Sequence, residues 1–121
     1  MFMISFFKTV HGQLFFELLV YILAITIVSS FWHNSFLTFL LLSILLIVAL
    51  FLWHDPLDLK IFIIAALGGS LGEIIAIFFG AWSYTLPNFL GIPVWLPLLW
   101  GFAAVTLRRL LSTLESVLKR E

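Results

Sequence analysis

Residues Phe36 to Trp53 read "FLTFLLLSILLIVALFLW", and this stretch of 18 residues without a charged side chain decides the fold class. A helix needs about 20 mostly apolar residues to cross the roughly 30 Å hydrocarbon core of a bilayer. Three further stretches are comparably apolar, at 14–31, 59–80 and 89–107. We therefore predict an all-α, polytopic integral membrane protein, a single membrane domain over residues 1–121 with four transmembrane helices.

The composition of the whole chain supports the same class. Of the 121 residues, 64% are hydrophobic and only 10% are charged, which lies far outside the range of soluble globular domains. Six basic and six acidic residues balance to a net charge of zero, so nothing indicates a nucleic-acid partner. The predicted partner is the lipid bilayer. The chain contains no cysteine, which excludes disulfides, thiolate metal sites and cysteine nucleophiles.

The basic residues indicate how the chain is oriented in the membrane. They lie before the first predicted span, at the start of the third and after the fourth, as Lys8, Lys60, Arg108, Arg109, Lys119 and Arg120. The two connections on the opposite side carry none, so the positive-inside bias places both termini in the cytoplasm of a protein of the cell membrane.

The segment 108–121 that follows the fourth predicted span is amphipathic. Its apolar residues share one helical stripe: Leu110, Leu111, Leu114, Val117 and Leu118. Two interpretations remain open for this C-terminal helix. It lies along the inner face of the membrane, or it extends the fourth span and packs on a neighbour.

Glu73 is a lone carboxylate inside an apolar run. It lies seven residues before Gly80, and at 1.5 Å per residue this places it about 10 Å below the outer end of the third predicted span. No basic residue occurs within ten positions on either side, and an ionised carboxylate at that depth is costly. We expect Glu73 to remain protonated at neutral pH and to be able to donate its proton. The alternative is an acid that only hydrogen-bonds a facing helix.

Small and aromatic residues surround this acid in the sequence. Small residues recur every four positions along the third predicted span, at Gly68, Gly72, Ala76 and Gly80, with Gly69 beside them. Such a bare face suits close packing of helices, and it also makes room for a flat apolar ligand. The aromatic residues near the outer end are Trp82, Tyr84, Phe89, Trp95 and Trp100. They form either an interfacial belt or the walls of a site whose π-faces stabilise a developing cation.

The remaining acids and histidines give weaker patterns. Asp55 and Asp58 lie three residues apart beside His54, a spacing that can hold Mg²⁺ against a diphosphate. The same two residues also suit the turn before the third span and the N-cap of that span, respectively. The histidines His11 and His33 have no partner at ligand spacing, so we predict neither a metal nor a cofactor.

One pattern within residues 72–101 consists, in order, of Glu73, Gly80, Trp82, Tyr84, Gly91, Pro93, Pro97 and Trp100. It resembles a stretch of the carotenoid-biosynthesis membrane proteins of the bacterioruberin and carotenoid hydratase type, in which a buried acid precedes a "G.(F/W).Y" turn and a "G.P…P..W" helix start. The resemblance covers about a quarter of this chain. Those proteins are longer and have more spans, so a complete site here would need a second copy or another membrane subunit.

The resemblance implies a protein that binds or transforms an apolar isoprenoid or carotenoid-like substrate by acid chemistry. Glu73 is then the proton donor, with Trp82 and Tyr84 as walls that stabilise the cation. The implied substrate-binding residues are Gly68, Gly69, Gly72, Trp95 and Trp100. No redox cofactor is implied.

Two alternative functions remain open. The first is a non-catalytic small subunit that packs into a larger membrane complex through the glycine face of the third span. The second is a proton-coupled transporter that acts as a dimer through Glu73 or through Glu17, which lies near the cytoplasmic end of the first span. Each interpretation expects a homo-oligomer or a second membrane subunit.

Overall fold

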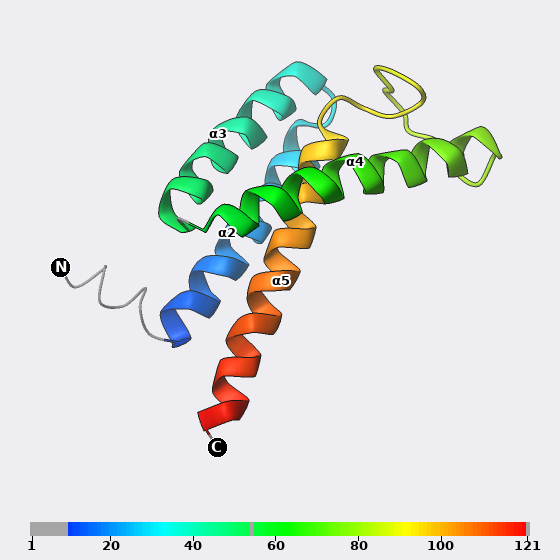
Figure 1. Ribbon diagram of the computed structural model, residues 1–121. Helices are drawn as coiled ribbons and strands as arrows, with labels where there is room; N and C mark the ends of the chain where they lie inside the picture. The colour runs from blue at the N-terminus through cyan, green and yellow to red at the C-terminus, as the bar shows by residue number, and fades with distance from the viewer. Residues whose placement is uncertain (1–9, 54, 121) are drawn as a thin grey trace.

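The computed structural model describes residues 10–53 and 55–120, and these residues form α-helices and no strand. The elements are α2 (Val10–Phe31), α3 (Ser35–Trp53), α4 (Pro56–Phe78) and α5 (Leu96–Arg120) (Figure 1). The predicted all-α class is confirmed. The predictions that involve Lys8, His54 and the side chains of His11 and Arg120 concern parts of the chain outside those that the structure describes.

Three of these helices have the length and composition of membrane spans. They are α2 from Gly12 onward, α3 and α4, and each is close to the roughly 20 residues that cross a bilayer. Large apolar side chains stay exposed along them, for example Phe36 at 75% and Ile64 at 71%. Outward-facing apolar residues of this kind are expected where a helix faces lipid instead of water. These three helices therefore have the length and apolar composition that the predicted membrane spans require.

The last helix differs from the predicted fourth span at 89–107. α5 begins only at Leu96 and then continues without a break to Arg120. Its apolar part, up to Leu107, is about 18 Å long at 1.5 Å per residue. The late start has a local cause, because Leu90 and Gly91 have positive φ values of 50° and 87° and form a turn. The amphipathic segment 108–120 is thus the second half of the same helix, as the extension interpretation expected.

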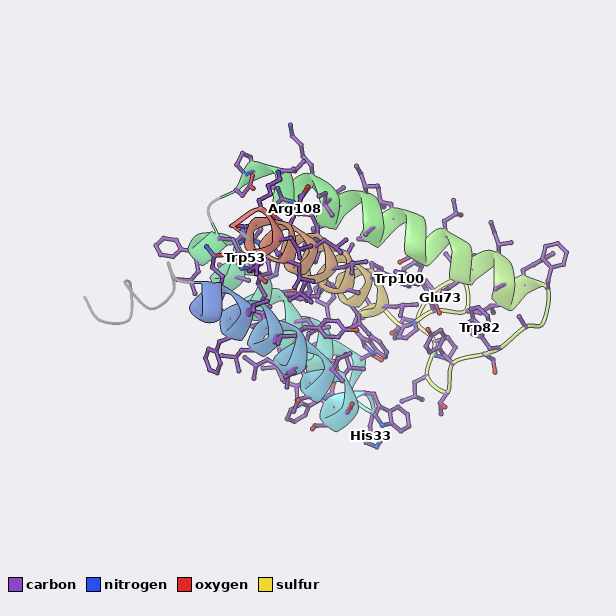
Figure 2. The ribbon with its side chains drawn as sticks, turned by 90° about the horizontal axis from the view of Figure 1, so that it is seen from below. His33, Trp53, Glu73, Trp82, Trp100 and Arg108 are labelled. Atoms are coloured by element: carbon purple, nitrogen blue, oxygen red, sulfur yellow. The ribbon has the colours of Figure 1, made fainter. Side chains whose placement is uncertain are left out.

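α5 occupies the centre of the arrangement, since it contacts α2, α3 and α4. Figure 2 shows α2 and α3 on one side of it and α4 on the other, and in Figure 1 α4 runs across α5. Phe62 of α4 packs edge-on against Phe102, with ring centroids 5.4 Å apart. A Cβ at Gly101 would lie 2.5 Å from the Phe62 ring, so the missing side chain is what lets α4 approach α5 this closely.

The bundle has two distinct ends, the arginine end and the loop end. The arginine end is where α2 and α4 start and α3 ends, beside Arg108 and Arg109. The loop end is where the connection 79–95 lies. This connection folds back from the far end of α4 to the start of α5 (Figure 1) and buries Ile92 and Trp95 against the helices.

Both ends of α4 are set by local sequence signals. Asp55 is the N-cap, and its carboxylate accepts the Leu57 N–H at 2.9 Å, while Pro56 is the first helical residue. The assignment of the N-cap to Asp58 was therefore wrong. Pro56 favours the first helical position because it lacks an N–H, so the cap falls on the residue before it. At the other end Gly80 has φ 84°.

The amides around Gly80 complete the cap. The Gly80 N–H donates to the Ile77 carbonyl and the Ala81 N–H donates to the Ala76 carbonyl, each at 3.0 Å. This is the bond pattern of a Schellman motif, in which glycine takes the left-handed position without steric cost. It turns the chain sharply at the loop end, so that the segment carrying Tyr84 returns toward α4.

Candidate functional site

Glu73 lies between two hydrogen-bond donors at the loop end. The Tyr84 hydroxyl donates to Glu73 Oε1. The Trp100 indole Nε1 donates to Glu73 Oε2 at 2.5 Å. Figure 2 shows Glu73 and Trp100 close together between α4 and α5. The lone acid of the sequence is therefore held by one donor from the connection 79–95 and one from α5.

Glycines allow both donors to reach the carboxylate. Gly69 lies one turn before Glu73, and a Cβ there would be only 2.2 Å from Cδ2 of Trp100. The Trp100 ring therefore lies directly against the Gly69 backbone. At Gly91 a Cβ would lie 2.8 Å from Ile77 Cγ2, so the connection also approaches α4 closely at this glycine.

A tight turn holds the connection in place. Phe89 and Ile92 exchange backbone hydrogen bonds of 3.1 Å and 2.9 Å across Leu90 and Gly91. The Asn88 side chain accepts the Val94 N–H at 2.8 Å. Because these local bonds fix residues 88–94, they constrain the part of the chain that leads from Tyr84 into α5, which carries Trp100.

Not all of the predicted site residues join this network. Tyr84 and Trp100 contact Glu73 directly, and Trp95 lies edge-on to Tyr84 with centroids 6.3 Å apart. Trp82 lies farther out on the connection and is 50% exposed (Figure 2). Among the described residues it forms neither a hydrogen bond nor a ring contact with Glu73.

The three glycines predicted as a ligand bed have different surroundings. Gly69 is covered by the ring of Trp100, whereas a Cβ at Gly68 or Gly72 would meet no heavy atom within 4 Å. The open face of α4 is therefore made by Gly68 and Gly72, and Gly69 serves the contact with α5.

The protonation state of Tyr84 follows from its surroundings. Burial, followed by the hydrogen bond to Glu73, raises the pKa of the Tyr84 phenol well above its usual value of 10.0. The phenol therefore keeps its proton at physiological pH and acts as a donor toward Glu73.

A pocket of about 250 Å³ adjoins this network at the loop end. Tyr84, Trp95 and Pro93 line it from the connection and helix start, and Val28 and Trp32 line it from the end of α2. Its walls are largely aromatic and aliphatic. Tyr84 thus connects the pocket and the network, since it lines the pocket and its hydroxyl donates to Glu73.

The arginine end holds a cluster of charged side chains that the sequence patterns did not predict. Asp58 is fully buried and accepts hydrogen bonds from Arg108 Nη1 at 2.8 Å and from Arg109 Nε at 3.0 Å. Arg108 also bonds Asp55 at 3.1 Å. The guanidinium of Arg109 lies 4.6 Å from the centroid of the Trp53 ring. The sequence signal was the pair of opposite charges at the ends of neighbouring spans.

This pairing with arginine argues against the suggested Mg²⁺ role of Asp55 and Asp58. Their carboxylates are engaged by arginine, and no group of three or more histidines and acids suited to a metal ion occurs within 10–53 and 55–120. His33, at the loop end, is instead stacked on Trp32 with centroids 4.0 Å apart.

No family model, curated protein or solved structure matches this chain.

Proposed function

We propose that this chain is an integral protein of the cell membrane that binds an apolar, isoprenoid-like molecule at the loop end and acts on it by proton donation from Glu73. The single observation that carries this proposal is the Glu73–Tyr84–Trp100 network beside an aromatic-walled pocket. Protonation of a carbon–carbon double bond needs an acid sheltered from water and aromatic faces near the resulting cation.

Tyr84 provides the link between the acid and the pocket. Glu73 does not itself line the pocket, but the Tyr84 hydroxyl that contacts it belongs to a residue that does. In the proposed step Glu73 is protonated on Oε1 and donates to the Tyr84 oxygen, the reverse of the hydrogen bond seen in the structure. The Tyr84 hydroxyl then gives its proton to an alkene carbon while Glu73 transfers its own proton to the phenol oxygen. A carbon–hydrogen bond forms, a carbocation remains beside Trp95, and Glu73 is left as a carboxylate. Because the exchange is concerted, the phenolate is never formed.

The size of the pocket limits what part of a substrate it holds. At about 250 Å³ it is below the roughly 300–1,000 Å³ of pockets that enclose drug-sized ligands. An end group of a long polyene fits this space, and the remainder of such a molecule stays in the bilayer. The open α4 face at Gly68 and Gly72 offers one apolar surface for it.

The proposed topology keeps four spans and cytoplasmic termini. The apolar half of α5, up to Leu107, would be the fourth and shortest span. Its support is the gathering of Lys60, Arg108 and Arg109 at one end of the bundle, which is the distribution that the positive-inside bias produces.

The test uses the purified full chain with Glu73→Gln, and Glu115→Gln as the matched control because Glu115 is an exposed carboxylate on α5. We expect the organic extract of the wild type to contain a polyene, detected by absorbance and mass. E73Q should retain the unreacted molecule, whereas E115Q should behave as the wild type. Wild-type extracts without any polyene, together with no quenching of tryptophan fluorescence by added polyene, would refute the proposal.

A second candidate function has its own support. No described residue covers the face of α4 at Gly68 and Gly72, and Leu67 and Leu71 beside it are 69% and 58% exposed. Bare helix faces let backbones pack closely in lipid, as expected of a small subunit or a homo-oligomer. Gly72→Leu should then reduce the mass of the detergent-solubilised complex to that of one chain, whereas wild-type protein that is already a single chain would contradict this function.

A further inference from the structure

We propose a second binding site, at the arginine end, in which Glu17 binds a small organic ammonium ion. Glu17 belongs to α2 and is only 3% exposed. Its two carboxylate oxygens accept the Thr113 hydroxyl at 3.1 Å and 3.4 Å. Among the described residues it has no ion pair, although a buried charge without a partner is unfavourable.

The charges around Glu17 balance without it. Arg108 pairs with Asp55 and Asp58, and Arg109 pairs with Asp58. Two arginines and two aspartates therefore sum to zero, so an ionised Glu17 leaves this cluster with one uncompensated negative charge. A single positive charge would restore neutrality.

A cavity adjoins the Glu17 carboxylate. Glu17 lines a pocket of about 210 Å³ together with Phe16, Trp53, Leu52, Gln13 and Arg109. Glu17 also lines a more polar pocket of about 160 Å³, whose other lining residues include the paired charges Asp55, Arg108 and Arg109. For scale, a dry cavity of about 150 Å³ accommodates benzene. The larger pocket therefore has room for a small amine or quaternary ammonium group.

The walls of this pocket match an organic cation. Phe16 and Trp53 meet edge-on with centroids 6.0 Å apart, and aromatic faces attract ammonium groups. The Nε1 of Trp53 is buried and has no hydrogen-bond partner within the described part of the chain. Arg109 faces the same space, but Asp58 neutralises it through two of its nitrogens. A divalent metal ion fits less well, because it requires several oxygen ligands.

Calorimetric titration of the full chain in detergent tests the assignment, with choline as the ligand and its neutral carbon isostere dimethylbutanol as the control ligand. Choline should bind and dimethylbutanol should bind far more weakly. Glu17→Gln should weaken choline binding on the order of 100-fold, the effect of removing one partner from a buried ion pair. Glu73→Gln should leave it unchanged, because Glu73 lies at the loop end. This control separates the present site from the proposed proton donor.

Equal binding of choline and dimethylbutanol, or equal affinity in E17Q and the wild type, would overturn the proposal, as would wild-type protein that does not bind choline. If E17Q does not fold, the wild type alone decides the question. Protons and choline compete for the same carboxylate, so acidification should weaken choline binding and leave dimethylbutanol binding unchanged. No effect of pH on choline binding would also overturn the proposal.

The ammonium group can come from a free amine or from a lipid headgroup. Repeating the titration in nanodiscs distinguishes these sources. Weaker choline binding in phosphatidylethanolamine than in phosphatidylglycerol identifies the headgroup as the occupant. Equal binding in the two lipids identifies a free amine. Either result supports the ammonium site.

Discussion

Replacing the buried aspartate of α4, Asp58→Asn, tests how α4 is joined to α5. Asp58 is fully buried and accepts three hydrogen bonds from Arg108 and Arg109. The substitution preserves the shape of the side chain but removes its charge. Arg108 keeps Asp55. Within residues 10–53 and 55–120, the contacts left to Arg109 are the Trp53 carbonyl at 3.4 Å and the face of the Trp53 ring.

The expected cost follows from the burial of this pairing. Removing one partner of a buried ion pair costs roughly 3–5 kcal/mol. Because Arg108 and Arg109 are 30% and 18% exposed, water compensates part of the loss, and we take the lower bound of roughly 3 kcal/mol. This is a large fraction of the roughly 5–15 kcal/mol that stabilises a typical protein.

The assay is unfolding of the full chain by a denaturing detergent in mixed micelles, followed by tryptophan fluorescence. Glu115→Gln is the matched control, since Glu115 pairs with Lys119 at 3.9 Å on an exposed surface and is itself 69% exposed. The control should not measurably shift the unfolding midpoint, whereas D58N should lower it clearly. If the two variants unfold together, the cluster is solvated as a surface pair would be, and the reasoning is wrong.

Two further predictions concern α4 and its N-cap. Gly69→Ala should destabilise the protein by about 1–3 kcal/mol, because its Cβ would lie 2.2 Å from Trp100. Gly72→Ala should be tolerated, since nothing lies within 4 Å of its Cβ. Thermal unfolding compares the two variants, and equal losses of stability would contradict the packing of Trp100 against Gly69. The bond from the Leu57 N–H, more than the nearby Arg108, lowers the pKa of Asp55 below its ordinary value of 3.8. A lowered folded-state pKa means that Asp55 contributes stability above pH 3.8 and loses it as the pH falls further. Unfolding measured across this acid range should therefore depend less on pH in Asp55→Asn than in the wild type, and identical profiles would rule out this contribution.

Within the candidate site, the sequence identified Glu73, Tyr84 and Trp100 by residue type and by resemblance, and the structure brings these three together. The sequence could not show that Gly69 lies beneath Trp100 while Gly68 and Gly72 face outward. All three glycines look alike in a small-residue stripe. Their roles differ because Trp100 covers only the side of α4 that faces α5.

The sequence by itself determined the all-α class and the three long apolar helices, whereas it placed the N-cap of α4 at Asp58 instead of Asp55. The class and the apolar helices depend on runs of neighbouring residues, so hydropathy and backbone preferences suffice. The tertiary structure alone decided that α5 is central, that Asp58 pairs with arginines 50 and 51 positions away, and that Glu17 meets a hydroxyl 96 positions away. Such contacts depend on how the helices pack, because packing brings together polar groups that no local pattern relates.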